Sequence, residues 1–81
     1  MVSKENENYI YYLVGKNLKK YRKISNYTQE SLARATNYSA QFIANLESPK
    51  THQTVSLGTL YAFARILKIP VSKLLEEENE E

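Results

Sequence analysis

Apolar residues recur at intervals of three and four along most of the chain, and this spacing predicts amphipathic helices and no strands. The first stretch runs from Tyr9 to about Ile24, after polar residues 1–8 that we expect to form a loose arm or a frayed helix start. Lysines occupy its outer face. Its expected inner face consists of Ile10, Leu13, Val14, Leu18 and Tyr21. We expect the tyrosines near its start to shield one end of the core, with a dimer or phosphate contact as the alternative.

Two short helices joined by a tight turn form the centre of the pattern. A threonine hydroxyl accepts hydrogen bonds from first-turn amides, so Thr28 is expected to be the N-cap of the first of them. The helical period then places Leu32 and Ala33 inside and leaves Gln29 and Arg34 outside.

The turn between these helices falls in residues 35–38. Asn37 is the residue there that adopts a left-handed backbone at low cost, so it is expected to close the corner. Ser39 is then expected to cap the second helix, whose Ile43 and Leu46 point inward.

The outer face of this second helix has an unusual composition. It carries Ala40, Gln41, Ala44 and Asn45, where a plain solvated surface normally carries Lys and Glu. Gln and Asn are the side chains that pair with the major-groove edge of adenine through two hydrogen bonds. The face therefore suggests contact with DNA bases.

The rest of the chain predicts two further helices. A polar loop containing Pro49 leads to a helix capped by Ser56, which ends at residues 68–70. Its expected inner stripe consists of Leu57, Leu60, Phe63, Ala64 and Leu67. A short fifth helix follows at 71–75, and residues 76–81 form an acidic tail.

These elements predict an all-α fold class with five helices around one small core. We expect the domain to span residues 14–75, with residues 1–13 forming an extension and the start of the first helix, and residues 76–81 the tail. Tyr27 and Tyr38 are expected to lie in the core.

The charges are distributed unevenly along the chain, so the net charge understates how basic most of it is. The net charge of the 81 residues is only +2, but five of the nine acidic residues lie in the last six positions. Residues 1–75 hold all 11 Lys and Arg against 4 Glu, a difference of +7. Such a balance suits a domain that meets a polyanion, although lysines on a solvated helix face are the plainer interpretation.

Several functional classes find no support in the sequence. There is no cysteine, and the lone His52 has no acid or serine at a motif spacing, so neither a metal site nor a catalytic base is expected. Two glycines cannot form a glycine-rich phosphate loop. The longest apolar run, residues 9–14, is far shorter than the ~20 residues that cross a bilayer. We therefore expect a cytoplasmic protein that is no enzyme and has no cofactor, no small-molecule ligand and no membrane contact.

Three segments together resemble a known family. LKKYRKISNYTQESLA at 18–33, NYSAQFIANLE at 37–47 and LYAFARILKIPVSKLL at 60–75 are similar to the helix-turn-helix domain of the phage repressor and Cro family, also called XRE. The resemblance covers about residues 14–75. It implies a lambda-repressor-like fold and binding to double-stranded DNA.

The resemblance also implies roles for individual residues. Arg22 and Glu47 match an ion pair that joins the first and third helices. The positions that match base-reading residues are Ser39, Ala40, Gln41, Ala44 and Asn45. The positions that match contacts to the DNA backbone are Thr28, Gln29, Phe42, Lys50 and Thr51. For Phe42, packing over the second helix is the alternative.

The chain departs from the family pattern in informative ways. Asn26, Asn37 and Lys68 stand where the family commonly has glycine, and Lys68 should be mildly strained there. No Arg or Lys occupies a base-reading position, so the commonest contact to guanine is missing and an A·T-leaning operator is expected.

Two functions follow as hypotheses. The first is a transcriptional repressor or autoregulator that docks as a homodimer on a pseudo-palindrome, pairing through about residues 65–71 as the family does. The second is a protein-binding antagonist that sequesters another regulator, for which the acidic tail is the only supporting feature.

Overall fold

The computed structural model describes residues 3–51 and 53–77, which form five α-helices without any strand. The prediction of an all-α fold is therefore confirmed. The helices are α1 (Tyr9–Ile24), α2 (Gln29–Thr36), α3 (Ala40–Glu47), α4 (Leu57–Leu67) and α5 (Val71–Leu74). His52 and residues 78–81 of the expected acidic tail lie outside the described residues.

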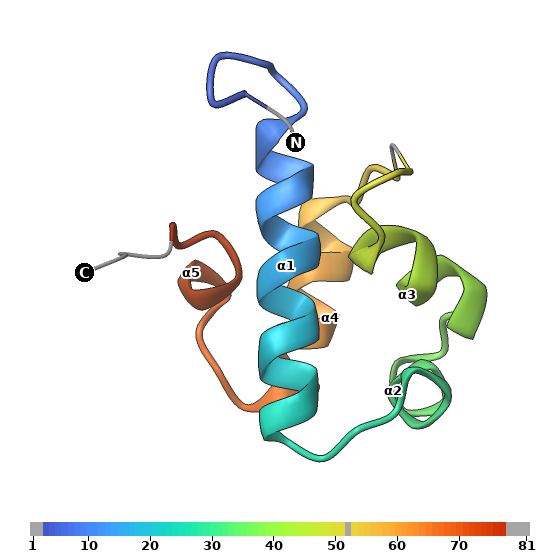
Figure 1. Ribbon diagram of the computed structural model, residues 1–81. Coiled ribbons are helices and arrows are strands. Elements are labelled where there is room, and N and C mark those ends of the chain that lie inside the picture. Colours follow the sequence, from blue (N-terminus) through green and yellow to red (C-terminus); the bar gives the residue numbers. More distant parts are fainter. Residues whose placement is uncertain (1–2, 52, 78–81) are drawn as a thin grey trace.

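Helix α1 runs through the middle of the structure (Figure 1). It contacts α3, α4 and α5, while α2 contacts α3 and α4. Apolar side chains from all five helices meet in one core, whose fully buried large members are Val14, Leu18, Leu32, Ile43, Phe63 and Leu74. The helix pair α2–α3 is thereby held on one side of α1, and α5 on the other (Figure 1).

Two residues predicted for the inner faces are instead exposed. Ile10 is 40% exposed and Leu57 is 76% exposed. Each lies in the first turn of its helix, beyond the part that neighbouring helices cover. Periodicity alone cannot show where along a helix its neighbours end.

A buried side-chain amide fastens α5 to α1. Asn17 is 3% exposed, and its Nδ2 donates to the carbonyl oxygens of Leu74 and Glu76 at 3.0 and 2.8 Å. These carbonyls lie at and just after the end of a very short helix, where no further backbone amide of the helix is available to donate a hydrogen bond. Asn17 supplies the missing donors, a role that its sequence position did not reveal.

Three non-glycine residues have a left-handed backbone. Asn26 and Asn37 have φ of 64° and 68°, which confirms the expectation that they take the place of glycine in two turns. Lys68 has φ of 61° and ends α4, with its amide donating to the Arg65 carbonyl at 3.2 Å. A lysine has no side chain suited to this conformation, so Lys68 bears the larger backbone cost.

Gly15 of α1 lies against the backbone of α3 where these two helices cross. A Cβ atom added at Gly15 would lie 1.9 Å from the carbonyl oxygen of Leu46 and 3.4 Å from the Cα of Glu47. No side chain fits in that space. The missing side chain therefore sets the distance between α1 and the end of α3.

We predict that Gly15→Ala destabilises the fold, because α3 must move away from α1. Overpacking of this kind costs about 1–3 kcal/mol, measured as the change in free energy of urea unfolding. Gly58→Ala is the matched control, since its Cβ would meet nothing nearer than the Ser56 Oγ at 3.9 Å. The control should be neutral or stabilising by up to about 1 kcal/mol, and equal losses in both variants would contradict the account.

We also predict that Lys68→Gly stabilises the protein by about 0.5–1 kcal/mol, because glycine adopts a positive φ without steric cost. Thermal unfolding measures the gain. Lys73→Gly, inside α5, should be destabilising. A loss of stability in Lys68→Gly would show that the lysine side chain has a role that outweighs its backbone cost.

Candidate nucleic-acid interface

Side-chain caps fix the beginnings of α2 and α3. Thr28 Oγ1 accepts from the Ser31 amide and Ser31 Oγ accepts from the Thr28 amide, both at 2.9 Å. Ser39 Oγ accepts from the Phe42 amide at 3.0 Å. The expected N-caps are thus present, and the hydroxyl of Thr28 already has a partner within the protein.

The turn between α2 and α3 is packed by aromatic rings. Tyr38 lies 5.6 Å from both Phe42 and Phe63, measured between ring centroids, and its hydroxyl lies 2.9 Å from Thr59 Oγ1. Tyr38 is nevertheless 37% exposed, so the prediction that it lies in the core is wrong: its ring covers the edge of the core. Tyr27 is half-buried and packs against the core as expected.

The ring of Phe42 packs against other side chains of the protein. It is half-buried and packs against the core, with its ring stacked on Tyr38 and 6.5 Å from Phe63. These ring contacts are with the α2–α3 turn and with α4, whereas the alternative from the sequence placed Phe42 over α2. Phe42 projects from the side of α3, so its aromatic contacts help to set the rotation of α3 about its own axis.

The outward face of α3 is made of small and carboxamide side chains. Gln41 is exposed, whereas Ala40, Ala44 and Asn45 are partly exposed. Gln41 Nε2 donates to Asn45 Oδ1 at 2.9 Å, so the two carboxamides, one turn apart, are held together. Each amide keeps further donor and acceptor capacity by its chemistry. Ser39 is exposed at the start of the same helix.

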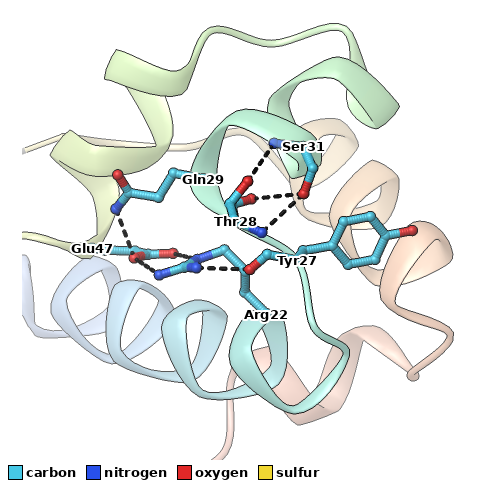
Figure 2. A network of polar contacts seen from close by, with 6 residues as sticks. All are labelled: Arg22, Tyr27, Thr28, Gln29, Ser31 and Glu47. Carbon is cyan, nitrogen blue, oxygen red and sulfur yellow. Dashed lines mark hydrogen bonds and ion pairs between the residues drawn. The ribbon is translucent and has the colours of Figure 1, made fainter.

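An ion pair joins α1 to the end of α3 (Figure 2). Arg22 Nε donates to Glu47 Oε2 at 2.8 Å and Nη2 donates to Glu47 Oε1 at 2.9 Å, the two-pronged geometry that guanidinium and carboxylate groups favour. The side chains are only 9% and 4% exposed. Hydrogen bonding to Glu47 raises the pKa of the Arg22 guanidinium, and burial opposes that shift.

The Arg22–Glu47 pair also forms hydrogen bonds with two further residues. Arg22 Nη1 donates to the Tyr27 carbonyl at 2.9 Å, and Gln29 Nε2 donates to Glu47 Oε1 at 3.0 Å (Figure 2). Gln29 is therefore half-buried and directed at the carboxylate, and the expectation that it faces outward is wrong. The carboxylate attracts its amide because α2 begins beside the end of α3. One carboxylate thus links α1, α2 and α3.

The loop after α3 carries Lys50 and Thr51, both exposed. The Thr51 hydroxyl donates to the carbonyl oxygens of Asn45 and Ser48, so it caps the last turn of α3. The Lys50 amide donates to Ser48 Oγ at 3.3 Å. Bonds within the loop thus hold the backbone that carries the Lys50 ammonium.

Neither a cluster of metal-binding side chains nor a membrane-spanning helix is found in the part of the chain that the structure describes. Among its residues no three His, Cys, Asp or Glu side chains are grouped closely enough to hold a metal ion. None of its helices has the length and apolar character that a membrane crossing needs.

Sequence reasoning missed one residue that positions this surface. The helical pattern predicts no role for Gly15. The available signal was a glycine inside an amphipathic helix, seven residues before Arg22 and hence on the same face. That face is the one that touches α3.

We predict that Arg22→Met destabilises the protein by about 3–5 kcal/mol, because it leaves the Glu47 carboxylate buried without its cation. Glu47→Met should cost a similar amount. The double variant should be more stable than either single variant, since it buries no unpaired charge. Urea unfolding of all four proteins measures this, and additive losses in the double variant would contradict a coupled pair.

A comparison with family models matches residues 15–80 to a helix-turn-helix domain. A search of curated proteins finds no match. The matched range contains the capped α2–α3 pair, the Gly15 crossing and the Arg22–Glu47 pair. The chain therefore belongs to the family of helix-turn-helix DNA-binding domains.

Proposed function

We propose that this protein is a sequence-specific transcriptional regulator of the XRE type, which places α3 in the major groove of double-stranded DNA. The proposal is supported chiefly by the outward face of α3. The inner side of that helix is buried and its end is tied to α1, so packing does not need the side chains of Gln41 and Asn45, although Ala40 also packs against the core.

The composition of that face suits base edges. Gln41 and Asn45 provide carboxamides that pair with adenine, and Ala40 and Ala44 provide methyl groups that fit beside thymine. Ser39, at the start of the helix, reaches either kind of base. Because no cation is present at these positions, we propose an operator in which A·T pairs dominate the contacts.

Contacts to the DNA backbone would flank α3 on two sides. The start of α2, with Thr28 and Gln29, presents first-turn amides and the positive end of a helix dipole to a phosphate. Lys50 and Thr51 flank the other end of α3. Because the side chains of Thr28, Gln29 and Thr51 already bond within the protein, we assign the main charge contact to the Lys50 ammonium and the rest to backbone amides.

A single domain of this size makes few base contacts, so we propose that two copies bind a pseudo-palindromic site with half-sites about one helical turn apart. Pairing would use residues 65–71, at the end of α4 and the start of α5. Such a protein would act as a repressor or autoregulator by occupying a promoter.

Selection from a random duplex library with the purified protein tests the proposal. We expect enrichment of a two-fold-symmetric, A·T-leaning site whose affinity falls steeply as salt rises. Absence of any enriched sequence would contradict it. The protein-binding antagonist would then be the better hypothesis.

We predict that Gln41→Ala weakens discrimination at one adenine position by about 1–3 kcal/mol and leaves the rest of the preferred sequence unchanged. The exposed helical position tolerates alanine, so stability should not fall. Repeating the selection with this variant measures the effect, and Ser72→Ala on α5 serves as the control. An unaltered sequence preference in Gln41→Ala would rule out the assigned role.

A further inference from the structure

One face of α1 concentrates positive charge. Between Tyr9 and Ile24 the helix contains no Asp or Glu, and its exposed residues include a group of lysines that we call the lysine face. The lysine face consists of Lys16, Lys19, Lys20 and Lys23. At about 100° per residue these four side chains fall within about 100° of arc, so they share one side of the helix.

The lysine face borders α3. Gly15 and Arg22, seven residues apart, mark the edge of α1 that touches α3, through the Leu46 carbonyl and through Glu47. Lys19 stands between them in the sequence and about 40° further round the helix, on the solvent side. The opposite edge, marked by Asn17, is occupied by α5. The lysine face therefore lies beside the end of α3, at the Gly15 crossing.

A hollow lies between the lysine face and the end of α3. It measures about 180 Å³, and Tyr12, Lys16 and Lys19 line it from α1. Its other wall consists of Leu46, Glu47, Ser48 and Pro49, directly before Lys50. Both oxygens of the Glu47 carboxylate accept bonds from Arg22 or Gln29, so that carboxylate is already compensated and does not repel an anion strongly.

We propose that the lysine face binds the sugar–phosphate backbone of DNA flanking the base pairs that α3 reads. The inference rests on the proposed function and extends its contact surface beyond the operator core. From Lys16 to Lys23 the helix rises about 10 Å, and one DNA strand presents a charge about every 3.4 Å along the axis. The length of the lysine face therefore matches several consecutive phosphates.

The occupant is identified by charge and by continuity. A helix face that carries four lysines, on a helix without Asp or Glu, fits a regular polyanion, and lysine ammonium groups contact phosphates without reading bases. The face is continuous, through the hollow, with the loop that holds Lys50. A strand leaving the major groove at α3 would pass along α1.

Binding to two duplexes tests this inference. One duplex contains only the selected operator, and the other extends it by ten base pairs on each side. We expect wild type to bind the extended duplex more tightly, with a salt slope steeper by about 2 for each bound protomer. Lys19→Gln and Lys23→Gln should each reduce the slope on the extended duplex by about 1 for each bound protomer and leave the sequence preference unchanged.

Lys73→Gln is the matched control, because it removes the same charge from α5 on the other edge of α1. It should behave as wild type on both duplexes. Two outcomes would overturn the inference while leaving the regulator proposal intact. In the first, wild type binds the two duplexes with equal affinity and equal salt slope. In the second, Lys19→Gln and Lys23→Gln bind the extended duplex with the same affinity and salt slope as Lys73→Gln. A wild type that selects no sequence at all would overturn both, so the two failures are distinguishable.

Discussion

The close crossing of α1 and α3 is the constraint on which the rest of the structure depends. Gly15 leaves room for the Leu46 carbonyl, and any side chain there would collide with backbone, which cannot swing aside as a side chain can. That short separation lets Arg22 reach Glu47 with two hydrogen bonds. It also presses Leu18 and Ile43 into a core in which both are fully buried. Close packing at Gly15 and the Arg22–Glu47 ion pair therefore hold the same two helices together, and we call this contact the α1–α3 joint.

The ion pair contributes orientation more than stability. Taking two charges out of water costs several kcal/mol per ion, and the bonds to Tyr27 and Gln29 help to offset that cost. Within the described residues, no buried side-chain nitrogen or oxygen lacks a hydrogen-bond partner. Since α3 is held by its inner side, its end and its cap, Gln41 and Asn45 on its outward face can be substituted without loss of packing. A surface of that kind can specialise in recognition.

Much of the fold could be predicted from the sequence because local rules act there. Helix periods, the caps at Thr28 and Ser39 and the left-handed Asn37 all depend on residues within a few positions. The errors concern relations between helices. Ile10 and Leu57 have the right period but lie exposed in the first turns of their helices, and Gln29 turns toward a carboxylate 18 residues away.

We propose that the α1–α3 joint presents α3, the start of α2 and the following loop to DNA as one surface. Amide chemical shifts recorded during titration with the selected operator test it residue by residue. The account predicts the largest changes at Gln29, in residues 39–45 and at Lys50, with α5 little affected. Changes confined to α4 and α5, with α3 unaltered, would contradict it.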